Sequence, residues 1–300
     1  MRVVVTGGTG FIGRRLGARL LEKGHDVVVL SRGGAGPPRT AGIRVVPWQT
    51  GAPDWEAEVD GSDGIVNLAG ESVAQRWTAG AKARIVSSRL GAVAALADAL
   101  ERARRKPSVL VNASAVGYYG SRGDEVLDES APPGDGFLAR TCVEWEEAAA
   151  RLARPGLRVV RIRIGTVLAA GGGALAKMLP AFRAFAGGPI GGGAQWMSWI
   201  HRDDLVDLLV FALEDGRTDG PLNGTAPNPA RNREFSAALG KAVHRPAIAP
   251  VPAAAVKLLF GEMAAVVLEG QRVVPAKALS LGFVFRFPRL AEALADAVRP

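Results

Sequence analysis

The 300-residue chain has only one cysteine, three histidines and two tyrosines, and it contains no long apolar run. A single thiol, at Cys142, excludes an internal disulfide and suits a reducing compartment, so we expect a cytoplasmic protein. The histidines, at positions 25, 201 and 244, have no paired spacing, and nothing in the sequence argues for a metal site. Because no apolar segment approaches the roughly 20 residues of a membrane span, we expect no membrane partner.

Acidic residues are outnumbered by basic ones, 29 to 37, which gives a formal net charge of +8. Such an excess can serve nucleic acid or a phosphorylated ligand. The charges are scattered, however, and the one dense basic cluster, residues 102–106, ends a predicted helix, where cations complement the helix dipole. We therefore expect no nucleic-acid partner, and an anionic small molecule accounts for part of the excess.

A glycine-rich segment follows the first strand pattern, residues 3–5, and a helical pattern begins directly behind it. Glycines spaced in this way let the backbone turn sharply and let a pyrophosphate approach without meeting a Cβ atom. The free N–H groups at the start of the helix then face the anion. A tight turn without a ligand is the alternative. The pattern predicts a dinucleotide site with contacts from Gly7, Thr9, Gly10, Phe11, Ile12 and Gly13.

The second strand pattern, residues 27–30, ends in the polar pair Ser31-Arg32. In dinucleotide-binding folds an acidic residue at this place binds the free 2′-hydroxyl of the adenosine ribose, whereas an arginine accepts a 2′-phosphate. Arg32 stands 19 residues after Gly13, and no acidic residue follows it. The sequence therefore favours NADP(H) over NAD(H) as the cofactor, and a solvated arginine at the end of a strand is the alternative.

Strands and helices alternate through the first half of the chain. Further strand patterns lie at residues 43–48, 63–70, 108–114 and 157–164, and helical patterns at about 81–105 and 137–152. This alternation predicts an α/β fold, a Rossmann-like doubly wound parallel sheet with a smaller C-terminal α/β substrate lobe. We expect residues 1–170 to form the nucleotide-binding domain, to which parts of 195–230 return, and residues 171–300 to form the smaller lobe. The cleft between the two is the expected substrate site.

Two further segments are expected near the cofactor. The fourth strand ends in Leu68-Ala69-Gly70, and ligands of open parallel sheets bind outside the carboxyl ends of the strands. The helix at 81–105 carries Lys82, Arg84 and Arg89 near its start, and Lys82 and Arg89 share one face. These cations either address phosphates or form a solvated helix surface.

Several motifs together resemble those of the extended short-chain dehydrogenase/reductase superfamily. They are the glycine-rich segment, Asn67-Leu68-Ala69-Gly70, Tyr119-Gly120 and Trp199-Ile200-His201-Arg202-Asp203-Asp204-Leu205. More closely, the chain is similar to an atypical branch labelled "epimerase family protein" or nucleoside-diphosphate-sugar epimerase-like, which carries a C-terminal domain of unknown function. Its hallmarks are Ser31-Arg32, Gly117-Tyr118-Tyr119-Gly120, Trp145-Glu146, Gly187-Gly188-Pro189-Ile190-Gly191, Leu222-Asn223-Gly224-Thr225-Ala226-Pro227, Leu268-Glu269-Gly270-Gln271-Arg272-Val273-Val274-Pro275 and Gly282-Phe283.

The resemblance implies NADP(H) held by the glycine turn, Ser31, Arg32, the end of the fourth strand, Arg84, Arg89 and Thr166 in the loop after the sixth strand. It implies an oxidoreductase or epimerase acting on a small molecule, and it identifies residues 246–300 as the family-specific C-terminal domain. Dimerisation through helices is common in the superfamily, so the resemblance also suggests a homodimer.

The catalytic pattern departs from that resemblance. The superfamily uses a Ser or Thr after the fifth strand and a Tyr-x-x-x-Lys pair on the next helix. Alignment through Glu146 puts Leu138 at the tyrosine position and Cys142 at the lysine position. Losing a positioned acid or base costs about 10²–10⁴ in rate. The residues that could replace the pair are Ser114, Tyr118, Tyr119 and Cys142, although packing roles explain the tyrosines and the cysteine equally well.

Two functions of different classes follow from these patterns. The first is an NADP(H)-dependent oxidoreductase or epimerase-like enzyme that acts on an unidentified small molecule. The second is a catalytically inactive, NADP(H)-binding regulatory or scaffold protein, because some relatives of this branch carry cell-division labels. Turnover of the cofactor separates the two.

Overall fold

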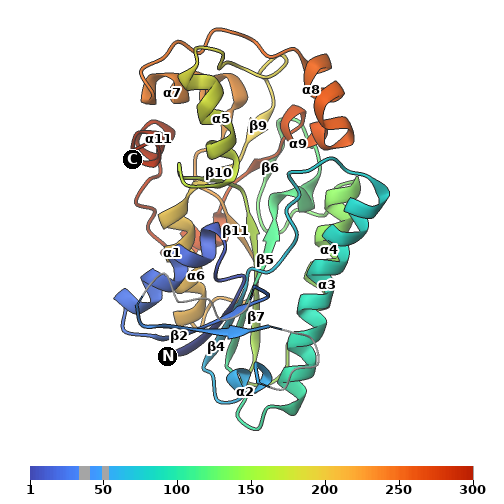
Figure 1. Ribbon diagram of the computed structural model, residues 1–300, viewed down its shortest axis with the longest axis vertical. Helices are drawn as coiled ribbons and strands as arrows, with labels where there is room; N and C mark the ends of the chain where they lie inside the picture. Colours follow the sequence, from blue (N-terminus) through green and yellow to red (C-terminus); the bar gives the residue numbers. More distant parts are fainter. Residues whose placement is uncertain (34–40, 49–53, 300) are drawn as a thin grey trace.

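The computed structural model describes residues 1–33, 41–48 and 54–299, and its centre is a parallel β-sheet (Figure 1). Seven strands of the described residues form this sheet, and each pairs in parallel with its neighbours. Their spatial order is β11 (Gly220–Gly224), β7 (Arg158–Ile164), β5 (Val109–Ala115), β4 (Gly64–Asn67), β1 (Arg2–Thr6), β2 (Asp26–Ser31) and β3 (Ile43–Pro47). The chain order reverses between β1 and β4, where doubly wound sheets bind their ligands.

Helices cover both faces of the sheet. The helical segments are α1 (Phe11–Glu22), α2 (Glu56–Val59), α3 (Ala79–Arg102), η1 (Val116–Tyr119), α4 (Phe137–Ala150), α5 (Gly173–Arg183), α6 (Arg202–Glu214), α7 (Asn232–Ala242), α8 (Ala253–Phe260), η2 (Gly261–Ala264), α9 (Ala265–Leu268), α10 (Ala276–Ser280) and α11 (Leu290–Ala297). In Figure 1, α1 and α6 lie on one side of the sheet and α3 and α4 on the other. No helix of the described residues is long and apolar enough to cross a membrane.

The alternation of side chains along β1 builds a core on each face. Val3 and Val5 pack in one cluster with Leu16 of α1 and Leu205 of α6. Val4, between them, points to the opposite face and belongs to the cluster that contains Trp145 of α4. Successive residues of a strand face opposite sides, so the uninterrupted valine run serves two buried layers.

Within the described residues, three small sheets lie outside the central one. They pair β8 (Thr166–Leu168) with β10 (Trp199–His201), β9 (Trp196–Met197) with β12 (Ala230–Arg231), and β6 (Val126–Leu127) with β13 (Arg272–Val273). Figure 1 shows α5, α7, α8 and α9 gathered with β9 and β10 at one end of the molecule. A third core, with Leu175, Trp199, Phe235 and Leu294, joins these C-terminal elements.

The predicted fold class is confirmed, with small differences in the bounds of its elements. The fourth strand ends at Asn67, so Leu68-Ala69-Gly70 lies just beyond the strand instead of within it. The seventh strand, β11, comes from the stretch 195–230 and pairs with β7 at the edge of the sheet. The predicted helices at 81–105 and 137–152 are α3 and α4, each ending two or three residues earlier than expected.

Candidate cofactor and active site

A buried polar ladder joins the carboxyl ends of β1 and β4 to the middle of β5. The hydroxyl of Thr6 donates to Asn67 Oδ1 at 2.6 Å, and Asn67 Nδ2 donates to Asn112 Oδ1 at 2.6 Å. The backbone N–H of Ala69 also donates to Asn67 Oδ1, at 3.3 Å. Since buried polar groups are costly unless they are hydrogen-bonded, this ladder fixes β1, β4 and β5 relative to one another at the edge where the cofactor is expected.

The glycine turn closes directly on the end of β1. The N–H of Gly10 donates to the carbonyl of Gly7 at 3.0 Å, and α1 begins at Phe11 with no side-chain cap. A Cβ atom on Gly13 would lie 2.4 Å from Gly7 O and 2.5 Å from Gly8 Cα, so only glycine lets the helix approach the turn this closely. Uncapped N–H groups at a helix N-terminus form a ready anion site.

Phe11 connects this turn to the C-terminal elements. A Cβ atom on Gly172 would lie 2.4 Å from the Phe11 ring, and the guanidinium of Arg202 lies 5.6 Å from the centre of that ring. Thr9 beside it is exposed, and Ile12 is half-buried. The contacts of Gly172 and Arg202 were not predicted, because both residues are far from the turn in sequence and neither belongs to a nucleotide motif.

Ser31 and Arg32 lie at the same edge of the sheet as the turn. Leu30 of β2 is the register partner of Thr6, so the residues that follow the two strands are neighbours. Ser31 is buried and its hydroxyl accepts the N–H of Gly33 at 3.3 Å, whereas Arg32 is exposed. Contact of the exposed Arg32 side chain with a 2′-phosphate stays a prediction.

The three cations near the start of α3, Lys82, Arg84 and Arg89, have separate surroundings. Arg89 packs against Gly70, and its Nη1 donates to the carbonyl of Glu71 at 3.0 Å. Its guanidinium carbon lies 5.1 Å from the centre of the Trp145 ring. Burial lowers the pKa of this guanidinium. Arg84 is exposed, and its Nη2 donates to Gln75 Oε1 at 3.4 Å. Lys82 forms an ion pair with Glu262. Of the two cations predicted to share a face, Arg89 lies at the end of the fourth strand, whereas Lys82 is engaged by the C-terminal region.

Thr166 begins β8 and ties this edge to the C-terminal elements. Its N–H donates to the carbonyl of Ser198 at 2.8 Å, and the N–H of Gly165 donates to the carbonyl of Gly224 at 3.0 Å. Leu68, on the other side, donates its N–H to the carbonyl of Thr6 at 3.1 Å. The expected cofactor residues from four strand ends thus lie along one edge of the sheet.

Ser114 takes part in a buried ion-pair network. Its hydroxyl donates to Glu146 Oε1 at 2.7 Å. Arg163 of β7 donates to both oxygens of Glu146, each at 2.9 Å, and both charged side chains are 4% exposed. The hydroxyl of Ser114 is therefore committed to holding this network together.

The two tyrosines differ in what their hydroxyl groups contact. Tyr119 is fully buried; its hydroxyl donates to Asn223 Oδ1 at 2.7 Å and accepts from Arg163 Nη1 at 2.9 Å. Burial raises the pKa of Tyr119 to about 12. Tyr118 is half-buried and stacks on Arg163 at 3.5 Å, and no hydrogen bond to its hydroxyl occurs within the described part of the chain. Tyr118 is thus the tyrosine with a free phenol.

Cys142 lies on α4 with 5% of its surface exposed. Burial, and then the charge of Glu146, raises the pKa of this thiol to about 11. Because the thiolate is the nucleophilic form, a thiol that stays protonated near neutral pH is poorly suited to attack. The environment favours a packing role for Cys142.

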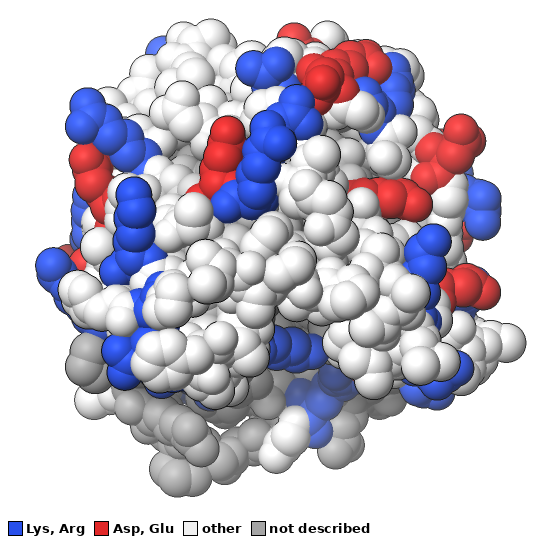
Figure 2. Space-filling view, turned by 90° about the horizontal axis from the view of Figure 1, so that it is seen from above, with Lys and Arg blue, Asp and Glu red and all other residues white. Residues whose placement is uncertain are grey.

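Figure 2 views the molecule from the end that carries the C-terminal elements. Lys and Arg side chains lie inside a hollow on this face, between protruding parts of the surface that are mostly uncharged. A basic hollow of this kind focuses a positive potential and suits an anionic ligand.

Comparison with known proteins identifies relatives along the whole chain. Residues 3–223 match the NAD dependent epimerase/dehydratase family, and residues 251–297 match a domain of unknown function, DUF1731. The epimerase family protein SDR39U1 homolog, chloroplastic, of Arabidopsis thaliana is 46% identical over 98% of this chain and 86% of its own length.

Two of the solved structures similar to this chain are identical to it at more than a third of the aligned residues. Human epimerase family protein SDR39U1 (isoform2), crystallised with NADPH, has a TM-score of 0.90 and 40% identity over 99% of each chain. A nucleoside-diphosphate sugar epimerase from Corynebacterium glutamicum has a TM-score of 0.78 and 34% identity over 99% of this chain and 58% of its own. The extent of these matches, together with the glycine turn at the switch point of a seven-stranded parallel sheet, establishes that the chain belongs to the NAD dependent epimerase/dehydratase family.

Proposed function

We propose that this chain binds NADP(H) and is an oxidoreductase or epimerase-like enzyme acting on a small anionic molecule. The single observation that carries the proposal is the uncapped N-terminus of α1 behind a turn that only glycine at position 13 permits. The similar human protein was crystallised with NADPH, which supports the choice of cofactor.

The residues present fit a dinucleotide with a 2′-phosphate. The glycine turn and the first turn of α1 would hold the pyrophosphate, and the Arg32 guanidinium would hold the 2′-phosphate. Arg89, beside Gly70, would bring a second cation to the end of the fourth strand. When bound, this cofactor supplies or accepts a hydride.

The sequence lacks the Tyr-x-x-x-Lys pair that the extended short-chain dehydrogenase/reductase superfamily uses as its catalytic residues. A Cβ atom on Gly117 would lie 3.2 Å from Leu138 Cβ, so the leucine at the tyrosine position adjoins the end of β5. The free phenol of Tyr118, which also follows β5, is the acid or base that we propose in its place. The Tyr118 ring stacks on the guanidinium of Arg163, whose central carbon lies 3.5 Å from the ring centre.

Replacement of Arg32 by alanine is expected to weaken NADPH binding by about 10- to 150-fold, because it removes one charge-assisted contact. Affinity for NADH should change little, since NADH has no 2′-phosphate. Calorimetric titration of both proteins with NADPH and NADH measures the two effects. Equal losses for both cofactors would contradict the role of Arg32, and no binding of either cofactor to the wild-type protein would overturn the proposed function.

The second candidate function is a regulatory protein that binds NADP(H) without turning it over. The burial of Cys142 and the commitment of Ser114 and Tyr119 to internal hydrogen bonds favour it. A screen of carbonyl compounds and nucleotide sugars, run on the wild type and Tyr118→Phe, distinguishes the candidates. NADPH oxidation that requires the Tyr118 hydroxyl supports the enzyme, whereas NADPH that binds and stays unoxidised supports the regulator.

We also propose a division into domains, a cellular location and an oligomeric state. Residues 1–170, with parts of 195–230, form the nucleotide-binding unit, and residues 171–300 form the substrate lobe, of which 246–300 is specific to this branch. The location is cytoplasmic. The protein forms a homodimer through α3 and α4.

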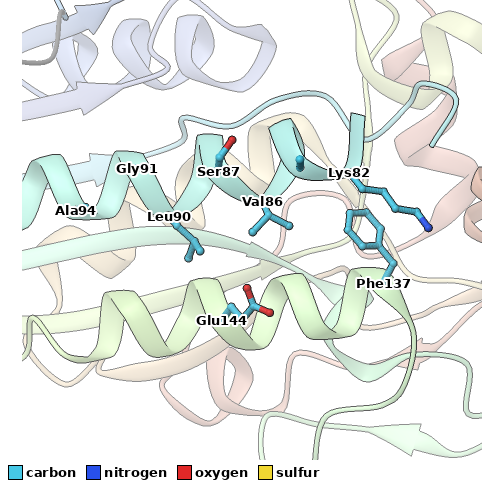
Figure 3. Close-up of a pocket in the computed structure, with 9 residues that line it drawn as sticks. Lys82, Val86, Ser87, Leu90, Gly91, Ala94, Phe137 and Glu144 are labelled. Atoms are coloured by element: carbon cyan, nitrogen blue, oxygen red, sulfur yellow. The ribbon is translucent and has the colours of Figure 1, made fainter. Parts of the chain in front are cut away.

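The homodimer proposal is supported by a groove between these helices, with a volume of about 740 Å³. Val86 and Leu90 of α3 point into it, toward Phe137 and Glu144 of α4 (Figure 3). Leu90→Glu should convert the dimer to a monomer, because a two-fold interface would place two new carboxylates together at a cost of several kcal/mol. Light scattering measures the mass, and Arg104→Glu, outside the groove, is the control. A dimer unchanged by Leu90→Glu would exclude this interface.

A further inference from the structure

Two guanidinium groups gather on one indole ring in the C-terminal part of the molecule. Arg231 and Arg272 lie 4.6 and 4.7 Å from the centre of the Trp196 ring. Trp196 Nε1 and Arg231 Nη2 both donate to Asp124 Oδ1, each at 2.7 Å. We call these four residues the Arg-Trp-Arg cluster. None of them belongs to the expected cofactor contacts.

Four separate segments converge to build this cluster, so it is a specific product of the fold. Trp196 is on β9 and Arg231 on β12, and these two residues are register partners. Arg272 is on β13, which pairs with β6 two residues after Asp124. A Cβ atom on Gly270 would lie 2.0 Å from Trp196 O, so only glycine lets the chain leading to Arg272 pass this close to β9.

The cluster carries an excess of positive charge. The hydrogen bond from Trp196, and then the charges of Arg231 and Arg272, hold the pKa of Asp124 below its usual range, so this carboxylate offsets one of the two cations. Arg231 is tied further by a 2.6 Å bond from Nη1 to the carbonyl of Ala194. The guanidinium of Arg272 donates no hydrogen bond to a protein atom within residues 1–33, 41–48 and 54–299. A stacked guanidinium presents a planar fork of N–H donors that matches carboxylate or phosphate oxygens.

Ser198 links the cluster to Thr166, an expected cofactor contact. Its carbonyl accepts the N–H of Thr166 at 2.8 Å, and its hydroxyl donates to the carbonyl of Gln271 at 2.6 Å and accepts the N–H of Val273 at 2.9 Å. Arg272 lies between these last two residues. Trp196 precedes Ser198 by two positions, or about 7 Å of extended chain, so the cluster is on the order of 10 Å from Thr166.

We propose that the Arg-Trp-Arg cluster binds an oxyanion, a carboxylate or a phosphate, of the substrate. The inference rests on the proposed function and narrows it, because it assigns the substrate an anionic group that binds on the order of 10 Å from Thr166, an expected cofactor contact. Arg272 supplies the free donors. Arg231, held by Asp124 and Ala194, supplies the second positive charge.

The experiment follows the six tryptophan indole N–H signals by NMR during titration of the full chain with inorganic phosphate and, separately, with malonate. Sodium chloride of equal ionic strength is the reference, and Trp196→Phe assigns the signal. We expect the Trp196 signal alone to shift and to saturate. Arg272→Met should weaken this binding by about 10- to 150-fold, the loss of one charge-assisted contact, and Arg272→Lys should weaken it less. Arg289→Met, an exposed arginine of the same region, should leave it unchanged.

A response to phosphate alone identifies a phosphorylated substrate, and a response to malonate alone identifies a carboxylate substrate; either supports the site. A Trp196 signal that does not saturate, or that responds equally in Arg272→Met, overturns it. NADPH titration of the same samples separates this inference from the proposed function. If NADPH binds but the Trp196 indole N–H signal does not shift with either anion, the anion site alone is refuted. If that signal shifts with an anion but NADPH does not bind, the proposed cofactor is refuted.

Discussion

Glu146→Ala is expected to lower the free energy of unfolding by about 3–5 kcal/mol, because it leaves a buried cation without its counter-charge. Arg163 now donates twice to this carboxylate, at 2.9 Å each, and its side chain is 4% exposed. The hydroxyl of Ser114 loses its 2.7 Å acceptor in the same change. Water cannot replace these partners without opening the packing between α4, β5 and β7.

The adjacent residue gives a matched control for this prediction. Glu147 pairs with Arg151 at 3.7 Å, and their side chains are 61% and 78% exposed, so Glu147→Ala should cost less than about 1 kcal/mol. Urea denaturation of the two variants and the wild type measures both values. Losses of similar size would mean that solvent reaches Arg163, and that the network does not hold the strand ends of the site in place.

The sequence was sufficient to predict where the site lies, but not which of its side chains contact one another. The network of Glu146, Arg163 and Ser114 shows why. The glycine turn, the strand before it and the helix behind it are encoded by neighbouring residues, and local periodicity was enough to predict them. The pairing of Glu146 with Arg163 joins a helix to a strand, and nothing in the spacing of the two residues indicates it. For the same reason, the sequence does not indicate that the hydroxyl of Ser114 donates to Glu146.

Strand β11 and the side chain of Lys82 show where local sequence patterns carry little information. Strand β11 has the sequence Gly220-Pro221-Leu222-Asn223-Gly224, whose residues disfavour strands, and it becomes a strand because it pairs with β7 at the sheet edge. Lys82 was grouped with Arg89 by helical spacing. Its ion pair with Glu262 depends on the packing of η2, which only the tertiary structure reveals. Propensity and periodicity describe one element at a time.

Gly13→Ala is expected to weaken NADPH binding by at least about 100-fold, because it forces the turn away from the start of α1. The new Cβ atom would lie 2.4 Å from Gly7 O and 2.5 Å from Gly8 Cα, and no rotation of a side chain relieves a clash with backbone. Loss of two charge-assisted hydrogen bonds to the pyrophosphate, about 1.5–3 kcal/mol each, accounts for this factor. Overpacking should also cost about 1–3 kcal/mol of stability.

Gly216→Ala is the matched control for this change of one methyl group. A Cβ atom at this exposed position meets no atom within 4 Å, so NADPH affinity should stay the same, and stability should rise by about 0.4–1 kcal/mol as the unfolded chain loses freedom. Calorimetry measures binding, and circular dichroism shows that each variant is folded. A folded Gly13→Ala protein that binds NADPH like the wild type would mean that the N-terminus of α1 does not hold the pyrophosphate. The cofactor would then have to contact the carboxyl ends of the strands by another route, with Arg89 and Arg32 as its remaining cations.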